Sequence, residues 1–233
     1  MSTPAELLRC TDLVVGYGRQ PLLPPISLSI GPGEFWAVVG RNGSGKSTWF
    51  RTALGLLPAI SGTVTHCGSL AYVAQQRAFD PLYPVTVREV VAMGTMRGWG
   101  FLRRGSDTSE AMEAVGVTAL AEQPFRALSE GQKQRVLLAR MITSGARLAL
   151  LDEPTAAMDA VAEREAMALL VRLQKRYAMS VVVVSHHLPV ALGYADRVLF
   201  LDRDGGTVVC GTPAEVAADD RFRTRYGDTL EST

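Results

Sequence analysis

The 233-residue sequence lacks two features that would direct it to a membrane or to nucleic acid. No apolar run approaches the roughly 18 residues that a membrane-spanning helix needs, so we expect a soluble chain. Charge is balanced, because 24 Lys and Arg residues stand against 23 Asp and Glu residues and leave a formal net charge of +1. This balance indicates neither a nucleic-acid-binding surface nor a polybasic membrane anchor. Any attachment to a membrane should therefore run through a protein partner.

Cysteine is scarce as well, and its three positions share no motif. Cys10, Cys67 and Cys210 lie far apart without the spacing of a metal site, and their odd number favours reduced thiols. Residues 1–6 lack the charged region and apolar stretch of a signal peptide, so none is expected. The length and the 47% of apolar residues indicate one folded α/β domain with a subdomain.

What the sequence does contain is a phosphate-binding loop. Residues 40–48 match the pattern G-x-x-x-x-G-K-[ST] at every required position. The apolar run 35–39 before the loop has the length of a strand, and residues 48–54 after it can form a helix. Glycines let successive backbone N–H groups point at one anion, and the helix N-terminus adds further donors. The loop residues predicted to bind nucleotide are Asn42, Gly43, Ser44, Gly45, Lys46, Ser47 and Thr48.

Two residues of this loop carry most of its chemistry. Lys46 supplies a full charge for the β- and γ-phosphates, and the hydroxyl of Ser47 is a ligand for Mg²⁺. The alternative is a chance glycine-rich turn with an exposed lysine, which the strand and helix on either side disfavour. The loop therefore predicts nucleotide binding.

The remainder of the chain predicts an antiparallel β layer beside a parallel core. Residues 26–30 alternate apolar and polar, as a half-buried strand does, whereas 70–73 and the valine-rich 180–185 are expected to be buried strands. Residues 77–128 are helix-rich and include a capping box at 86–89. This block indicates an inserted helical subdomain rather than a separate domain.

Two further segments can act on a bound nucleotide. The apolar run 148–151 is followed by Asp152 and Glu153, where one carboxylate can hold Mg²⁺ through water and the other can polarise an attacking water. Such a pair alone is more often a solvated strand end, and the phosphate loop upstream reverses that preference. Ser129 and Gln132 form a second capping box, so the following helix has an N-terminus free to meet an anion, although an ordinary helix cap explains the same pattern.

Together these segments resemble the ATP-binding cassette (ABC) ATPases, in the family's order and over essentially the whole chain. The matching positions are Tyr17 for the aromatic that stacks on adenine, Gln75 for the Q-loop glutamine, 128–132 for the signature, 152–153 for the end of Walker B, 156–159 for the D-loop and His186 for the switch histidine. The signature combined with both Walker motifs is highly specific.

The sequence departs from the family pattern at two positions. Glu130 replaces the usual glycine of the signature, and we expect its side chain to point away from the nucleotide. His187 stands where the family usually has an acid, and we expect it to be exposed or to support His186. Local alternatives stay open elsewhere, because Tyr17 could be a packed ring in a turn and a lone histidine such as His186 is more often structural.

The resemblance implies an α/β fold with a P-loop NTPase (RecA-like) core. In a single domain over 1–233, the core and an antiparallel β subdomain would occupy 1–76 and 136–233, and an inserted α-helical subdomain would occupy about 77–135. It also implies ATP hydrolysis in a head-to-tail homodimer with two composite sites. Such sites act by positioning and charge stabilisation rather than by covalent chemistry.

The resemblance further assigns roles to individual residues. Ser47, Gln75 and Asp152 would organise Mg²⁺ and its waters. Glu153 would position or deprotonate the lytic water, and His186 would hold the γ-phosphate. The residues expected to meet the nucleotide from the signature and the D-loop are Ser129, Gly131, Gln132 and Asp159, the first three acting from the opposite subunit.

A transporter ATPase without a membrane span needs separate permease subunits. The resemblance therefore implies a chain held at the cytoplasmic face of the inner membrane by its permeases, with an extracytoplasmic substrate-binding protein and no nucleic-acid partner. Residues 79–87 resemble a segment of manganese, zinc and iron-type importers, which favours import of a metal ion. The alternatives are another cargo, export, a non-transport ABC ATPase, and a catalytically dead regulatory protein.

The sequence disfavours the last two alternatives. Non-transport types carry a long coiled coil or a second cassette, and this chain has neither. A regulatory protein without catalytic activity would not need the residues expected to act on the phosphates, Lys46, Asp152, Glu153 and His186.

Overall fold

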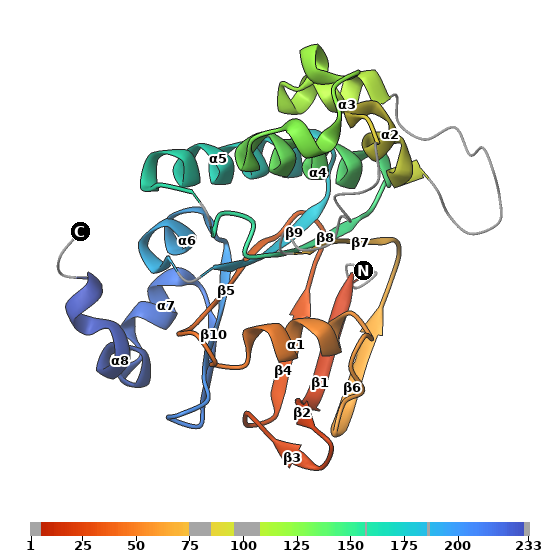
Figure 1. Cartoon of the computed structure of the whole chain (residues 1–233). Coiled ribbons are helices and arrows are strands. Elements are labelled where there is room, and N and C mark those ends of the chain that lie inside the picture. Colours follow the sequence, from red (N-terminus) through yellow and green to blue (C-terminus); the bar gives the residue numbers. More distant parts are fainter. Residues whose placement is uncertain (1–5, 75–84, 96–107, 157, 186, 231–233) are drawn as a thin grey trace, which may run out of the picture.

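A six-stranded sheet forms the centre of the computed structural model, which describes residues 6–74, 85–95, 108–156, 158–185 and 187–230 (Figure 1). The strands follow the order β11–β10–β5–β9–β8–β7, and neighbours are parallel except for the antiparallel pair β10 and β11. Their bounds are β5 (Phe35–Val39), β7 (Leu70–Val73), β8 (Leu148–Asp152), β9 (Ser180–Ser185), β10 (Arg197–Asp202) and β11 (Thr207–Gly211).

Two small antiparallel sheets and a set of helices complete the fold. The smaller sheets contain β4 (Ile26–Ile30), β1 (Leu8–Val14) and β6 (Ser61–His66) in that order, and β2 (Gly16–Tyr17) with β3 (Gln20–Pro21). The α-helices are α1 (Lys46–Ala53), α2 (Val87–Ala92), α3 (Thr108–Val115), α4 (Glu130–Thr143), α5 (Ala160–Arg176), α6 (Leu188–Tyr194), α7 (Pro213–Ala218) and α8 (Asp220–Leu230). Short 3₁₀ turns lie at Met93–Thr95, Thr118–Leu120 and Phe125–Ala127.

The central strands consist mostly of apolar residues because both of their faces are covered. Every residue of β5 and of β9 is buried, as expected for interior strands of a parallel sheet. On one face, α2 to α5 pack against side chains such as Val181 and Val183. On the other face, the β1–β4–β6 sheet and α1 cover Val182 and Val184, so alternate valines of one strand enter different cores (Figure 1).

Several sequence predictions are confirmed and one is wrong. The capping boxes at Thr86 and Ser129 are both formed, and they begin α2 and α4. The prediction that 70–73 is a buried strand is wrong in part, because β7 lies at the edge of the sheet and Tyr72 is 39% exposed. Helix α4 crosses residue 135, so the predicted limit of the helical subdomain falls inside one helix.

The parallel arrangement determines where functional side chains gather. Strands β5, β8 and β9 run in the same direction, so their carboxyl ends meet at one edge of the sheet. The phosphate loop follows β5, and Asp152 ends β8. Of the helices in the described ranges, none is long and apolar enough to cross a bilayer.

Candidate nucleotide-binding site

The phosphate loop joins β5 to α1 and depends on glycine at two close approaches. Gly40 has φ +153, and a Cβ at this position would lie 2.3 Å from the carbonyl oxygen of Leu201. Gly45 has φ +101 at the N-cap of α1, where a Cβ would lie 2.8 Å from Leu23 Cδ1. A side chain at either position would force the loop away from its neighbours, so the backbone path requires glycine here.

Lys46 is held inside this loop by the loop's own carbonyl groups. Its Nζ donates to the carbonyl oxygens of Gly40 (2.8 Å) and Arg41 (2.9 Å), and the residue is only 5% exposed. Burial lowers the pKa of Lys46, and the charges of Glu153 and Asp152 oppose that shift. The ammonium group is therefore a pre-positioned cation at the first turn of α1, where backbone donors also favour an anion.

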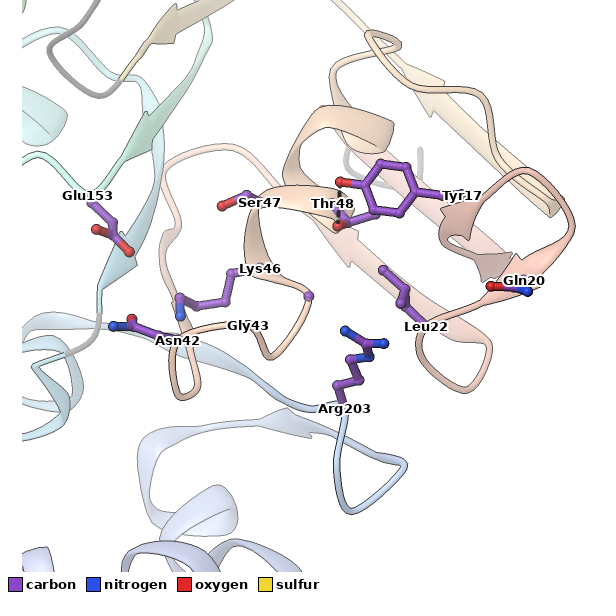
Figure 2. A pocket seen from close by; sticks show the side chains of 11 residues that line it. Tyr17, Gln20, Leu22, Asn42, Gly43, Lys46, Ser47, Thr48, Glu153 and Arg203 are labelled. Carbon is purple, nitrogen blue, oxygen red and sulfur yellow. Dashed lines mark hydrogen bonds between the residues drawn. The ribbon is translucent and has the colours of Figure 1, made fainter.

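A cavity of about 520 Å³ opens beside the loop (Figure 2). Its walls come from the β2–β3 hairpin, the phosphate loop with the start of α1, the chain after β8, and the β10–β11 turn. The lining residues are Tyr17, Gln20, Leu22, Asn42, Gly43, Gly45, Lys46, Ser47, Thr48, Glu153 and Arg203. The structure thus brings one predicted aromatic residue, most of the predicted phosphate loop and the predicted catalytic carboxylate to a single space.

Tyr17 and Glu153 mark two different parts of this cavity. Tyr17 is 55% exposed and lies beside the start of α1, where its hydroxyl oxygen is 3.4 Å from the Thr48 hydroxyl. Glu153 appears on the far side of Lys46 from Tyr17 (Figure 2). An extended ligand with an aromatic base at one end and phosphates at the other suits this separation.

Glu153 has an unusual backbone conformation. Its φ is +47, a left-handed value that non-glycine residues seldom adopt outside turns and functional sites. The Ala156 N–H donates to the Glu153 carbonyl oxygen at 3.3 Å, so the chain turns immediately after the residue. This turn directs the Glu153 carboxylate into the cavity.

Asp152 is half-buried and directly precedes Glu153 at the end of β8. Burial raises the pKa of Asp152, and the neighbouring charge of Glu153 raises it further, whereas Arg51, Lys46 and a hydrogen bond from the Tyr72 hydroxyl lower it. Of the predicted metal ligands in the described residues, Ser47 lines the cavity together with Glu153, whereas Asp152 does not line it. Hydroxyl and carboxylate oxygens are the donors that Mg²⁺ prefers. Within the described ranges no cluster of three or more His, Cys, Asp or Glu side chains could hold a metal ion.

Replacing Asp152 with Asn is expected to stabilise the nucleotide-free chain while it slows hydrolysis. Because the pKa of Asp152 is raised in the folded state, the charged form opposes folding above the unfolded pKa, and the cost disappears below it. The midpoint of thermal unfolding should therefore rise by a few degrees at neutral pH and not at strongly acidic pH. Thermal melts over a pH series would measure this gain. E165Q, which changes an exposed acid on α5, should show none, and a D152N midpoint at or below the parent's at neutral pH would contradict the expectation.

The signature and D-loop residues are not brought to this cavity within one chain. Ser129 is the exposed N-cap of α4 and accepts from the Gln132 N–H (3.3 Å), while its own N–H donates to Gln132 Oε1 (2.9 Å). Gly131 lies in the first turn of the same helix. Asp159 caps α5 by accepting from the N–H groups of Val161 and Ala162, each at 2.9 Å. None of these four predicted residues lines the cavity.

Four further residues were named in the sequence analysis, and their outcomes differ. Gln75 and His186 lie outside the described residues. Ser44 does not line the cavity, and its buried Oγ has no hydrogen-bond partner in the part of the chain that the structure describes. Glu130 forms an ion pair with Lys133 (2.7 Å) one helical turn along α4.

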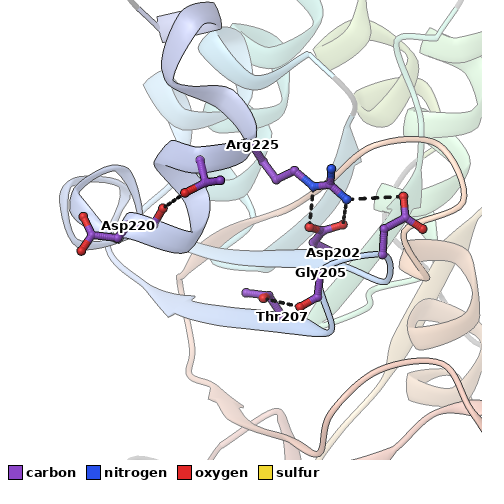
Figure 3. Close-up of polar contacts among 7 residues, drawn as sticks. Asp202, Gly205, Thr207, Asp220 and Arg225 are labelled. Carbon is purple, nitrogen blue, oxygen red and sulfur yellow. Dashed lines mark hydrogen bonds and ion pairs between the residues drawn. The ribbon is translucent and has the colours of Figure 1, made fainter.

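Sequence reasoning missed three residues of the cavity wall, namely Gln20, Leu22 and Arg203. Arg203 belongs to the turn after β10, which α8 anchors: Arg225 donates to both carboxylate oxygens of Asp202 (2.7 and 3.3 Å) and to Asp204 (3.4 Å) (Figure 3). No local motif surrounds these residues. They reach the cavity only because the hairpin and the β10–β11 turn fold beside the phosphate loop.

Comparison with known proteins agrees with this geometry. The protein family described as "ABC transporter" matches residues 23–156 of the sequence. The chain belongs to the ABC transporter ATPase family. It is therefore an ATP-binding ATPase subunit of a transporter, and the resemblance drawn from the motifs is confirmed.

The relatives of this ABC ATPase are similar over nearly their full length. The zinc import ATP-binding protein ZnuC of Cereibacter sphaeroides is 36% identical over 224 residues, which are 95% of this chain and 88% of that protein. The hemin import ATP-binding protein HmuV of Streptomyces coelicolor is 38% identical over 245 residues, or 99% and 87% of the two chains. Among solved structures, cbiO1 of Clostridium perfringens, part of the ABC transporter complex cbiONQ, has a TM-score of 0.78 and 27% identity, covering 97% of this chain and 96% of that one.

Proposed function

We propose that this ABC ATPase hydrolyses ATP at a Mg²⁺-dependent site to power import of a metal ion through separate permease subunits. The observation that carries the chemistry is the cavity in which Lys46, Ser47 and Glu153 lie together while Tyr17 stands apart from Glu153. The adenine would stack on Tyr17, and the triphosphate would run along Gly43 to Thr48 towards Glu153. This direction puts the γ-phosphate at the end of the cavity that holds the carboxylate.

In this mechanism the side chains around the cavity bind the phosphates, hold Mg²⁺ and activate water. Lys46 would exchange its two loop carbonyl partners for the β- and γ-phosphates, so that nucleotide replaces contacts already oriented for it. Ser47 and Asp152, with Gln75, would hold Mg²⁺, which when bound neutralises phosphate charge. Glu153 would orient the lytic water and accept its proton, and His186 would keep the γ-phosphate in line. The site depends on positioned charges rather than on covalent chemistry.

The completed site is proposed to need a second copy of the chain. Ser129, Gly131 and Gln132 are exposed or half-exposed at the start of α4 and lie outside the cavity of their own chain. A helix N-terminus offers backbone donors to an anion, and a head-to-tail partner would bring it over the γ-phosphate. Asp159, at the start of α5, would lie at the same interface.

The proposed partners and location follow from the transporter family. The cassette would sit at the cytoplasmic face of the inner membrane, attached through two permease subunits and supplied by an extracytoplasmic binding protein. The zinc-importer relative supports a metal ion as cargo, and the hemin-importer relative makes an iron chelate the second candidate. The cargo does not enter the nucleotide cavity, so the donor atoms of this chain do not select it.

Reconstitution would test this function. The chain, co-purified with its permease and placed in liposomes containing internal ATP, should hydrolyse ATP only with Mg²⁺ and accumulate labelled zinc or manganese in the presence of the binding protein. Hemin serves as the second cargo, and a neutral sugar serves as the negative control. Accumulation of hemin alone would overturn metal-ion import, and hydrolysis that no cargo or permease alters would overturn the transport assignment.

A further inference from the structure

Glu163 is a buried acid that the nucleotide site does not use directly. It lies in the first turn of α5, and its side chain is 2% exposed. A carboxylate in such surroundings is costly unless partners satisfy both of its oxygens. Sequence alone would place it as a solvated charge near a helix N-terminus, so its burial demands a structural explanation.

Both oxygens of Glu163 have partners from other segments. Oε1 accepts from the hydroxyl of Thr155 at 3.0 Å, and Thr155 is itself buried. Oε2 lies 2.5 Å from Nδ1 of His187, which donates to it. A carboxylate at this distance holds the imidazole with a proton on Nδ1 and fixes the orientation of the ring.

The two partners of Glu163, Thr155 and His187, follow the neighbouring strands β8 and β9 in the sequence. Thr155 stands two residues after Glu153, inside the turn that the Ala156 N–H closes on the Glu153 carbonyl oxygen. His187 is the N-cap residue of α6 and follows β9, and its N–H donates to the Ser185 hydroxyl at 3.0 Å. Glu163 therefore ties the chain that leaves the catalytic carboxylate to the chain that leaves the neighbouring strand.

We propose that Glu163 is a positioning residue for hydrolysis, acting through Thr155 and His187. A left-handed conformation at Glu153 persists only when the surrounding structure holds it, and the Thr155 contact supplies one such restraint. The same carboxylate fixes His187, so the ends of β8 and β9 are held in register with each other. The inference rests on the proposed function, because it assigns Glu163 to the positioning of Glu153.

The pairing also accounts for the histidine at position 187. An acid at position 187 would face the buried Glu163 carboxylate, and two like charges at this distance oppose each other. A histidine at this position donates a hydrogen bond to the Glu163 carboxylate, so the contact is favourable rather than repulsive. Residues 163 and 187 should therefore behave as one unit in mutational tests.

The first test compares E163L with E165L. E163L keeps the size of the side chain and removes both hydrogen bonds, whereas Glu165 is an exposed residue on the same helix. We expect E163L to bind a fluorescent ATP analogue within about twofold of the parent and to lower the single-turnover hydrolysis rate by about tenfold or more. E165L should match the parent in both measurements. Unchanged hydrolysis by folded E163L, or an equal loss of binding and hydrolysis, would overturn the proposal.

The second test does not depend on the stability of E163L. H187D should lose turnover, because it opposes two carboxylates, and E163Q in the same chain should restore it, because an amide can accept from Thr155 and donate to the new acid. A double variant no faster than H187D would contradict the proposal. A parent chain that fails to hydrolyse ATP would instead overturn the proposed function, so the two failures are distinguishable.

Discussion

The E153Q variant is expected to bind ATP at least as tightly as the parent chain and to hydrolyse it about 100-fold to 10,000-fold more slowly, the range that a general base usually contributes. Glutamine has nearly the shape of glutamate, so the cavity wall is preserved, but its amide cannot accept the proton of an attacking water. The change also removes a negative charge that raises the pKa of Asp152, so repulsion near the incoming triphosphate falls. We therefore expect E153Q to keep its affinity for ATP while its rate of hydrolysis falls.

This separation can be measured with one set of samples. Equilibrium dialysis gives ATP affinity, a single-turnover assay gives the rate, and size-exclusion chromatography shows whether ATP holds E153Q in a dimer. E165Q is the matched control, because it makes the same chemical change at an exposed position on α5. Near-parental hydrolysis by E153Q would remove Glu153 from the role of catalytic base.

The features predicted correctly from sequence are those that local chemistry determines. The phosphate loop was predictable because glycines at fixed offsets, a preceding apolar strand and a following helix all lie within about twenty residues of sequence. The capping boxes at Thr86 and Ser129 have the same character, since each is closed by a side chain three positions later. The completely buried β9 was predictable from four consecutive valines.

The features that were missed depend on contacts between distant segments. Strand order is not encoded in a short apolar run, so the edge position of β7 and the exposure of Tyr72 could not be derived from residues 70–73. The burial of Glu163 arises only when α5 packs beside the N-terminus of α6. Arg203 reaches the cavity because α8 holds its turn through Arg225 and Asp202, an ion pair between residues 23 positions apart.

In an E153Q background, S129R is expected to abolish the dimer that ATP stabilises while leaving ATP binding to the monomer unchanged. Ser129 is exposed and lies outside the cavity of its own chain, so a bulky cation there can disturb only a site completed by another copy. Loss of the N-cap costs about 1 kcal/mol in itself, which requires a control. T212R removes the same kind of capping box from α7, and it should leave the ATP-dependent dimer intact. A dimer that survives S129R would contradict the proposed interface.

A mixing experiment tests the head-to-tail arrangement more directly. K46A removes the phosphate-binding cation and S129R disables the signature, so each chain alone should be nearly inactive. Random pairing of equal amounts makes half of the dimers mixed, and each mixed dimer has one intact site formed by Lys46 of one chain and Ser129 of the other. If each site acts independently, the mixture should recover about a quarter of the parental turnover, because a two-fold dimer contains two equivalent composite sites. The double variant K46A/S129R carries both changes on one chain. Its dimers contain no intact site, so we expect no turnover from it. Recovery by the mixture alone would show that one nucleotide site draws its residues from two chains, whereas a mixture as inactive as its components would contradict the composite site.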